Sequence, residues 1–310
     1  MVKKDFMMIT ILGTTATGKT SLAVEVARKL GCEILSADSR QVYRRMDIGS
    51  GKDLAEYGSG SDAVPYHLID IVEPGTEFNI FEYQHTFLDA YNDIIKRDGK
   101  ALFCGGSGMY LDAVLNRYKL VKVDPDPELR AILEKESDEQ LVARLTQLKP
   151  LHNTTDTKDR ERLYRAIEIA IHSMVASDDE GDFPEIKSAI FGLQTERDIL
   201  KERIQRRLKE RMESGMAEEI EALLNSGITA EKLEFYGLEY RFVTQYVSGV
   251  LEKDEMLEIL GKAIYQFARR QAKWFRRMER KGTKIIWLNA EENNVDKIIA
   301  SQLLSTDYTD

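Results

Sequence analysis

The sequence predicts an α/β fold in which a parallel sheet is flanked by helices and carries an inserted all-helical domain. Short apolar runs alternate with helical patterns along the first half of the chain, which is typical of parallel strands joined by crossover helices. A glycine-containing loop joins the first apolar run to the first helical pattern. The interval 194–281, between the last two apolar runs, contains several helical patterns and no strand signal. A sheet interrupted in this way indicates an insertion.

Strands are expected at short apolar runs that are bounded by turn residues. These runs are 7–12, 33–35, 101–104, 189–193 and 284–288. Helices are expected where apolar residues recur every three or four positions. These segments are 21–30, 81–96, 128–136 and 160–172, with a further helix beginning at 110. We therefore expect an α/β core of residues 1–193 and 282–310, within which 120–158 forms a lid-like helical stretch, and a helical insertion at 194–281.

The composition is that of a soluble globular protein. Of 310 residues, 43% are hydrophobic and 31% are charged, which excludes a disordered or collagen-like chain. The net charge of −9 excludes a surface that is basic throughout but not a local basic patch. The two cysteines, Cys32 and Cys104, are too few for a disulfide framework or a four-ligand zinc site, so we expect buried, reduced thiols.

The sequence contains no segment typical of a membrane span or a cleaved leader. All apolar runs fall short of the roughly 20 residues that a transmembrane helix needs. The apolar stretch near the N-terminus leads directly into the glycine loop and lacks a small-residue cleavage site. We expect an intact, cytoplasmic chain without membrane contact.

Basic residues are concentrated in two segments of the expected insertion. Residues 197–211 hold seven Lys or Arg against three acids, and residues 269–281 hold seven against Glu279. The second segment has two helical faces. One consists of Ile264, Phe267, Gln271, Trp274 and Met278, and the other of Arg269, Lys273, Arg276 and Arg280. A packed helix with a basic stripe suits a nucleic-acid backbone, although it could also be a charged surface without a partner.

The strongest local signal is a complete phosphate-binding loop. Gly13-Thr14-Thr15-Ala16-Thr17-Gly18-Lys19-Thr20 fits the pattern G-x-x-x-x-G-K-[ST]. Its glycines let successive backbone N–H groups point at phosphate oxygens, and Gly18 would open the following helix, whose positive end favours an anion. Lys19 adds a positive charge and the Thr20 hydroxyl can ligate Mg²⁺. The loop predicts a di- or triphosphate ligand, a Mg²⁺ cofactor and a P-loop NTPase-like core.

The chain departs from the nucleotide hydrolases at the next strand. There an apolar strand would end in an aspartate that holds the metal, but the run 101–104 ends in Gly105-Gly106-Ser107-Gly108. This departure weakens an ATPase or GTPase interpretation. The nearest replacement is Asp38, which directly follows the second expected strand. Asp38 could ligate a metal, act as a base, or cap a turn.

Several ordered segments resemble the bacterial tRNA dimethylallyltransferases. The phosphate loop is similar to the family's GPTASGKT, with Thr14 and Thr17 in place of proline and serine. The other similar segments are SADSRQVY at 36–43, MDIG at 46–49, YHLID at 66–70, GGSGMY at 105–110, Arg162 with RAIE at 165–168, and ARRQ at 268–271 followed by WFR at 274–276. FYGLE at 235–239 is a loose version of the family's IGYKE. The resemblance runs from residue 9 to about residue 277.

The resemblance implies transfer of the dimethylallyl group of dimethylallyl diphosphate to N6 of adenosine 37 in the anticodon loop of tRNA. Departure of diphosphate develops negative charge, which the phosphate loop, Lys19, Mg²⁺ and one arginine can stabilise. The resemblance assigns that arginine to Arg207. The adenine amine must lose a proton, and the resemblance gives this role to Asp38. The implied catalytic residues are therefore Asp38, Lys19 and Arg207.

The resemblance also implies which residues contact tRNA. Ser39, Arg40 and Gln41 would line the base pocket with Asp38, and Ser107 would lie near the target nucleotide. The remaining implied contacts are Arg130, Glu161, Arg162, Leu163, Tyr164 and Arg165, and the basic stripe adds Arg269, Lys273 and Arg276. A base leaves its stack easily in a single-stranded loop, which favours an anticodon-loop substrate over a duplex. We expect a monomeric enzyme.

Three other functions share parts of this pattern. An adenylate prenyltransferase would need the same phosphate loop but no basic helical block. A small-molecule P-loop kinase would not need the segments DSRQVY and GGSGMY. A non-catalytic RNA-binding protein would have no use for intact Lys19, Thr20 and Asp38.

Overall fold

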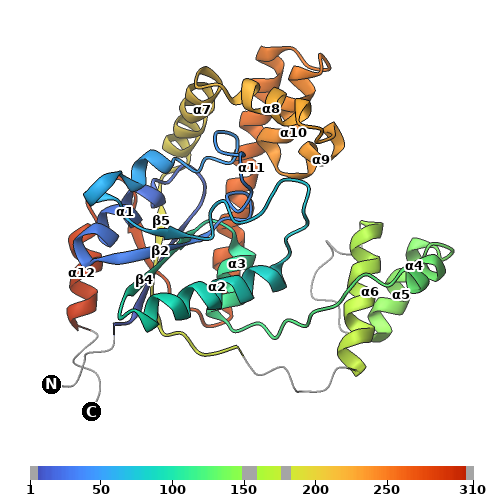
Figure 1. Ribbon diagram of the computed structural model, residues 1–310, viewed down its shortest axis with the longest axis horizontal. Helices are drawn as coiled ribbons and strands as arrows, with labels where there is room; N and C mark the ends of the chain where they lie inside the picture. Colours follow the sequence, from blue (N-terminus) through green and yellow to red (C-terminus); the bar gives the residue numbers. More distant parts are fainter. Residues whose placement is uncertain (1–5, 149–158, 176–182, 305–310) are drawn as a thin grey trace. The chain divides into compact units, whose positions relative to one another are not determined.

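The computed structural model describes residues 6–148, 159–175 and 183–304. Within these residues six parallel strands form one sheet in the order β3-β2-β4-β1-β5-β6 (Figure 1). The strands are β1 Met8–Gly13, β2 Cys32–Ala37, β3 Tyr66–His67, β4 Lys100–Gly105, β5 Ser188–Gln194 and β6 Ile286–Asn289. The predicted α/β, P-loop NTPase-like fold is confirmed.

The sheet contains one strand more than apolar runs predict. Strand β3 is only two residues long, too short to show the alternation that marks a strand in sequence. It lies within the segment that the family resemblance singles out at 66–70. At this edge of the sheet, Nε2 of His67 lies 2.7 Å from Oε2 of Glu33 in β2. The strand expected at 284–288 begins two positions later, at Ile286.

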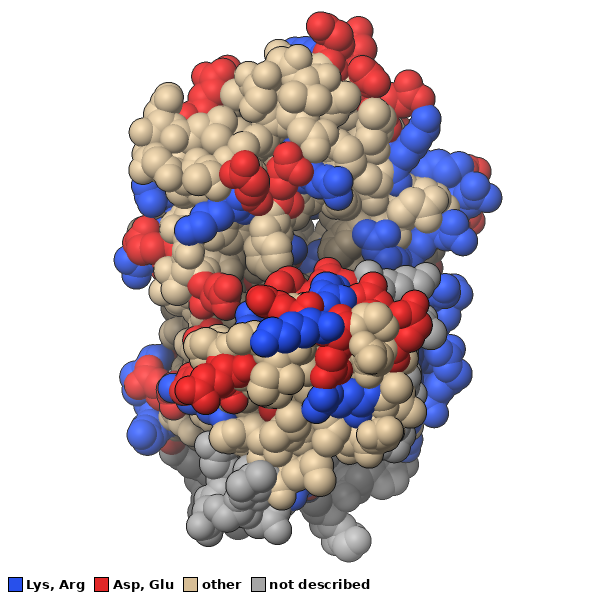
Figure 2. All heavy atoms as spheres, turned by 90° about the vertical axis from the view of Figure 1, so that its right-hand side faces the viewer, with Lys and Arg blue, Asp and Glu red and all other residues tan. Residues whose placement is uncertain are grey.

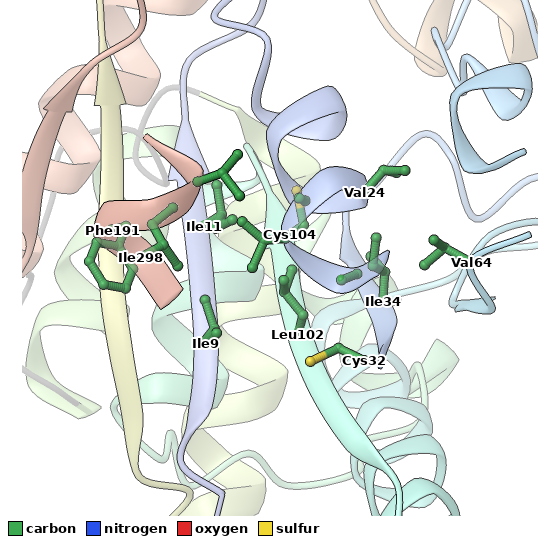
Figure 3. Close-up of a cluster of buried hydrophobic side chains, with 14 of the residues drawn as sticks. Ile9, Ile11, Val24, Cys32, Ile34, Val64, Leu102, Cys104, Phe191 and Ile298 are labelled. Atoms are coloured by element: carbon green, nitrogen blue, oxygen red, sulfur yellow. The ribbon is translucent and has the colours of Figure 1, made fainter. Parts of the chain in front are cut away.

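Helices cover both faces of the sheet. On one face, α1 (Lys19–Leu30) and α12 (Val295–Leu304) enclose a core with the strands (Figure 3). That core includes Ile9, Ile11, Val24, Ile34, Leu102, Phe191 and Ile298. On the other face lie α2 (Ile80–Lys96) and α3 (Gly108–Leu115), and the rings of Phe87 and Phe103 are 4.7 Å apart there. With helices on both faces, the strands β1, β2, β4 and β5 are buried on both sides, whereas the edge strands β3 and β6 are largely exposed.

Both cysteines are buried free thiols in the strands, as the sequence predicts. Burial raises the pKa of the Cys32 thiol and that of the Cys104 thiol to about 12 each. Neither thiol is therefore ionised near neutral pH, and both act as small apolar groups of the core.

A second group of helices is inserted between β5 and β6. It consists of α7 (Arg197–Glu213), α8 (Met216–Asn225), α9 (Ala230–Phe235), α10 (Leu238–Val247) and α11 (Lys253–Arg280). These helices enclose a core of their own, which also takes in Val42, Tyr43 and Met46 from the segment after β2. The insertion is therefore all-helical, as predicted, but it shares its core with the α/β part.

The compact units do not coincide with the division expected from the sequence. One unit comprises Met1–Asn116 and Glu185–Asp310, and the other comprises Arg117–Pro184. The helices of 194–281 belong to the first unit because their core includes side chains that follow β2. The second unit extends beyond the lid-like stretch of 120–158; residues 149–158 of that stretch lie outside the described residues.

The second unit is a small helical cluster of α4 (Pro127–Leu133), α5 (Asp138–Leu148) and α6 (Arg160–Val175). Its core consists of Leu133, Leu141, Leu145, Leu163, Tyr164, Ala166, Ile167 and Ala170. The expected helices at 128–136 and 160–172 are both present, although α4 already ends at Leu133. Asp126 begins α4 by accepting hydrogen bonds from the N–H groups of Glu128 and Leu129, an ordinary N-cap.

Charge is unevenly distributed over the surface. Figure 2 shows groups of Lys and Arg side chains and groups of Asp and Glu side chains with uncharged side chains between them. In the part of the chain that the structure describes, no helix is both long and apolar enough to cross a membrane.

Candidate active site

The phosphate loop lies between β1 and α1, the strand–loop–helix context that its sequence pattern requires. Ala16 and Gly18 adopt left-handed conformations, with φ of 61° and 79°. Gly18 is the residue that precedes the first turn of α1. The loop therefore turns its second half toward the positive end of this helix, where backbone N–H groups suit a phosphate.

The base of the loop is closely packed. A Cβ on Gly13 would lie 2.8 Å from Oγ1 of Thr17 and 3.2 Å from the carbonyl oxygen of Leu193, so no larger residue fits. The Thr17 hydroxyl is buried and donates to the carbonyl of Thr14 at 2.8 Å. These contacts hold the loop closed without using a bound ligand.

Lys19 lies at the centre of a group of charges. Burial lowers the pKa of its ammonium group; Asp38 and Asp53 oppose this effect, and Arg207 adds to it. The three residues predicted to be catalytic therefore lie close enough to interact electrostatically. A bound diphosphate would stabilise the charged form of Lys19 that burial disfavours.

This environment predicts proton uptake when dimethylallyl diphosphate binds. As pH rises through the lowered pKa, Lys19 loses its proton in the free protein, and the ligand's negative charge should restore it. Calorimetry above neutral pH in buffers of different ionisation enthalpy should detect this uptake. It should vanish in Lys19→Arg, since a guanidinium stays protonated. Equal uptake in both proteins would contradict the assignment.

Asp38 directly follows β2, and its neighbours Ala37 and Ser39 are hydrogen-bonded to Ser107 in the turn that follows β4. Its Oδ1 accepts a hydrogen bond from the N–H of Arg40 at 2.9 Å, so the carboxylate does cap a turn. The Ser107 hydroxyl accepts a hydrogen bond from the N–H of Ser39 at 2.9 Å. A Cβ on Gly105 would lie 2.2 Å from the carbonyl oxygen of Ala37. Glycine thus lets two strand ends meet at the edge where ligands of parallel sheets bind.

Two of the other residues expected at the base pocket differ in their surroundings. Gln41 is buried: its Nε2 donates to the carbonyl of Gly51 at 2.9 Å and its Oε1 accepts from the Ser36 hydroxyl at 3.2 Å. Its amide braces the segment after β2. Arg40 is half-buried beside Gly237 at the start of α10. Contact of either residue with tRNA stays a prediction.

Arg207 lies on α7 and pairs with a carboxylate that sequence reasoning does not identify. Its guanidinium donates a hydrogen bond to Asp53, which also lies 4.0 Å from a guanidinium nitrogen of Arg211. Arg211 in turn lies 3.8 Å from Glu239. Burial lowers the pKa of Arg211, and Arg207 contributes to the shift.

A small pocket connects this charged group with the phosphate loop. Its lining residues are Thr15, Ala16, Ile204, Arg207, Leu208, Arg211, Glu239 and Ile264. Arg207 and Arg211 make one part of the pocket cationic. Ile204 and Leu208 of α7 and Ile264 of α11 make the part between these helices aliphatic. These are the two kinds of contact that a ligand with an anionic group and a short hydrocarbon chain would make.

The basic stripe of α11 is exposed where the sequence predicts it. Arg269, Lys273 and Arg276 all face solvent. The buried face is Ile264, Ala268, Gln271, Phe275 and Met278, with spacings of four and three residues. Phe267, expected on that face, is 39% exposed. It lies one position before Ala268, and the smaller residue is the one that faces the core.

The remaining predicted tRNA contacts belong to the second unit. Leu163 and Tyr164 are 1% and 3% exposed in its core, so the structure contradicts a side-chain contact for either. Glu161 and Arg162 are exposed, with side chains 75% and 60% accessible. Their neighbours on the helix are core residues because α6 buries one of its faces.

Arg130 and Arg165 share a buried carboxylate. Glu168 is 1% exposed and lies 2.6 Å from Nε of Arg130 and 3.2 Å from a guanidinium nitrogen of Arg165. Burial alone would raise the pKa of Glu168, but hydrogen bonds from Arg130, the Asp126 N–H and Arg165 hold it below its usual value. These two arginines therefore serve the fold of the second unit, whatever else they contact.

Replacing Arg130 by alanine should destabilise the second unit. The change leaves a buried carboxylate with one guanidinium fewer, so we expect the free energy of unfolding to fall by about 2 kcal/mol. Arg162→Ala is the matched control, because Arg162 is exposed and should change stability by less than about 0.5 kcal/mol. Urea titration measures both. Equal stability of the two variants would show that the Glu168 pair is not structural.

The donor groups of the site fit Mg²⁺ carried with a diphosphate. Among the described residues, no three His, Cys, Asp or Glu side chains cluster as a metal site. Mg²⁺ commonly retains several waters and binds through few protein groups together with phosphate oxygens. The Thr20 hydroxyl, in the first turn of α1, is the predicted protein ligand.

Comparisons with known proteins place the chain among prenyl-transferring enzymes. The family described as IPP transferase matches residues 41–278, and the one described as isopentenyl transferase matches residues 7–62. A tRNA dimethylallyltransferase of Geotalea uraniireducens is 54% identical over 285 residues, which cover 92% of this chain and 93% of that protein. One of Parabacteroides distasonis is 47% identical over 295 residues, covering 95% of this chain and 96% of that protein.

Solved structures agree. The tRNA isopentenylpyrophosphate transferase of Bacillus halodurans is 28% identical, with a TM-score of 0.68 and coverage of 98% of both chains. A eukaryotic dimethylallyltransferase whose structures capture it acting on tRNA is 20% identical and shares the fold, with a TM-score of 0.73 over 97% of this chain and 80% of that chain.

The parallel sheet and the glycine loop between β1 and α1 define a protein of P-loop NTPase-like fold. Within that class, the chain belongs to the IPP transferase family, whose described match spans most of its length. The resemblance noted in the sequence is thereby confirmed, as is the enzyme class.

Four residues of this site escape sequence reasoning about function. Asp53, Arg211 and Glu239 form the charged group around Arg207, and Gln271 of α11 contacts the phosphate loop. A polar amide on an otherwise apolar helical face was the available signal for Gln271, because buried amides require partners. Glu239 is the last residue of the FYGLE segment, which matches the family motif only loosely, and no pattern in the sequence marks Asp53 or Arg211.

Proposed function

We propose that this chain transfers the dimethylallyl group of dimethylallyl diphosphate to N6 of adenosine 37 in the anticodon loop of tRNA, with release of diphosphate. The observation that carries the proposal is the placement of the phosphate loop between β1 and α1, with Asp38 directly after β2 and Arg207 of α7 lining a pocket with Thr15 and Ala16 of the loop. The aliphatic side chains in this pocket are of the kind that would contact a five-carbon chain. The names of the relatives support the same reaction.

The reaction breaks the bond between the allylic carbon and a diphosphate oxygen and forms a bond from that carbon to N6. The electron pair of the broken bond leaves with the diphosphate. Lys19, Arg207 and the N–H groups of the phosphate loop stabilise this charge, and the electrostatic effect is large because the site is partly buried. The proton released by N6 passes to the carboxylate of Asp38.

The Thr20 hydroxyl would hold Mg²⁺, which supplies further positive charge to the leaving diphosphate when bound. The chain's own residues orient the two substrates. Ser39 and Ser107, whose side-chain and backbone groups are hydrogen-bonded to each other, lie where the target nucleotide would meet Asp38. The enzyme acts as a monomer in the cytoplasm.

The exposed basic stripe of α11 binds the tRNA backbone. Replacing Lys273 and Arg276 together by alanine should weaken tRNA binding and flatten its salt dependence, because each lost phosphate contact lowers the slope of log affinity against log salt by about one. Binding measured between low and moderate salt checks this. Lys262→Ala, an exposed lysine elsewhere on α11 that pairs with Glu258, is the control. An unchanged slope in the double variant would show that the basic stripe does not bind the tRNA backbone.

Mass spectrometry of the products tests the proposed reaction. The protein, Mg²⁺ and dimethylallyl diphosphate are incubated with unmodified tRNA or with AMP. A five-carbon mass gain on an anticodon-loop adenosine is the expected result. A gain on AMP alone would move the chain to adenylate prenyltransferases, and a gain on neither substrate would overturn the proposal.

A further inference from the structure

A buried amide on α11 contacts the phosphate loop. The Oε1 of Gln271 accepts a hydrogen bond from the N–H of Thr15, with an N···O distance of 2.9 Å. Its Nε2 donates to the carbonyl oxygen of Gly106 at 2.8 Å. The side chain lies on the buried face of α11 and is 8% exposed. Both ends of the amide thus bind backbone groups of different loops.

These two loops carry the two halves of the proposed reaction. Thr15 belongs to the loop that would bind the diphosphate of the donor. Gly106 precedes Ser107, whose hydroxyl holds the N–H of Ser39 beside Asp38. The hydrogen-bonded path from the phosphate loop to the proposed base therefore passes through one amide, which comes from the helix that bears the basic stripe.

The turn at Gly106 packs closely against the Gln271 amide. A Cβ on Gly106 would lie 2.6 Å from Nε2 of Gln271 and 3.2 Å from the carbonyl oxygen of Gly13. One turn along α11, Trp274 packs against Gly108, and its Nε1 donates to Oδ2 of Asp112 in α3 at 3.1 Å. The glycine turn is thus in close contact with α11 on either side of Ser107.

We propose that Gln271 is a positioning residue that fixes the phosphate loop relative to the turn at Gly106 and Ser107. It aligns the diphosphate of the donor with the adenosine that approaches Asp38. The alignment of the diphosphate with the adenosine rests on the proposed transferase function, whereas the effect of Gln271 on the phosphate loop does not depend on that function. The amide meets both needs at once, because the contact with Thr15 needs an acceptor and the contact with Gly106 needs a donor.

Gln271→Met tests this role, since methionine keeps the length and apolar stem of the side chain and removes both hydrogen bonds. We expect the Kd of inorganic diphosphate with Mg²⁺, measured by calorimetry, to rise about tenfold, which corresponds to about 1.4 kcal/mol. The single-turnover rate of transfer at saturating donor should fall at least about tenfold, since small misplacements of reacting groups slow chemistry strongly. The tRNA affinity should change by less than about twofold.

Gln266→Met is the matched control, because Gln266 is exposed on the same helix; it should behave as the wild type. Gly106→Ala displaces the same amide from the other side and should reproduce the pattern if Gln271→Met fails to fold. The double variant should be no slower than the slower single variant, because both changes act on the same contact between Gln271 and the turn at Gly106.

Two results would overturn the proposal. In the first, both single variants keep the wild-type diphosphate Kd and transfer rate. In the second, both single variants lower the melting temperature, the tRNA affinity and the transfer rate together, as general destabilisation would. If the wild type shows no transfer while Gln271→Met still weakens diphosphate binding, the proposed function fails and the positioning of the phosphate loop stands.

Discussion

Replacing Asp38 by asparagine should lower the rate of transfer by about a hundredfold to ten-thousandfold, the range that a general base contributes. Asparagine retains an oxygen that accepts the hydrogen bond from the Arg40 N–H, so the turn after β2 should keep its shape. What it loses is the ability to take a proton. A single-turnover assay with tRNA and labelled dimethylallyl diphosphate measures the rate, and tRNA affinity should stay within about twofold.

Asp38→Ala separates two of the three roles that the sequence leaves open for this carboxylate, the base and the turn cap. If Asp38 acts as the base, the alanine and asparagine variants should both be slow. If it serves only as a cap, asparagine should be as fast as the wild type and alanine slow, which would end the assignment. Asp89→Asn, a change of an exposed carboxylate on α2, is the control for the loss of one negative charge.

The parts of the fold that the sequence predicts well are those set by neighbours in the chain. The phosphate loop is recognisable because its glycines, Lys19 and Thr20 lie within eight consecutive positions. The strands β1, β2, β4 and β5 are apolar runs because each is buried on both faces. Strand β3, with two residues, carries no such pattern.

The parts that the sequence does not predict depend on contacts between distant segments. Asp53 and Arg207 are 154 positions apart, and Gln271 meets Thr15 across 256 positions. The residues next to Asp53 in the sequence do not indicate that it pairs with Arg207, and those next to Gln271 do not indicate that it contacts Thr15. The division into units fails for the same reason, because side chains at 42–46 complete the core of helices that follow β5.

The burial of side chains also bears on the tRNA contacts that were expected from the family resemblance alone. Arg162, Leu163 and Tyr164 are consecutive, but α6 turns the first to solvent and the other two into the core. A family motif identifies a segment, whereas the 3.6-residue period of the helix decides which members of it can reach a partner. Only Glu161 and Arg162 of this segment present mostly exposed side chains.

Replacing Arg207 by alanine should lower the rate of transfer by about a hundredfold to a thousandfold, as expected when a donor to a developing anion is removed. The side chain lines the pocket next to the phosphate loop, and its charge acts on Lys19. Arg206→Ala is the matched control: Arg206 lies beside it on α7, is 59% exposed and pairs with Glu210 at 3.8 Å. Steady-state assays over a range of dimethylallyl diphosphate concentrations give kcat and KM for each variant.

A slow Arg207→Ala variant has two explanations, because the change also removes the guanidinium that donates a hydrogen bond to the Asp53 carboxylate. Asp53 would then keep Arg211 at 4.0 Å but lose its closer partner, and its less neutralised charge near Lys19 would repel diphosphate and slow the reaction by itself. The double variant Asp53→Asn with Arg207→Ala removes that charge. If Arg207 stabilises the leaving group, the double variant should stay slow. Recovery to within a few-fold of the wild-type rate would show instead that Arg207 only neutralises Asp53.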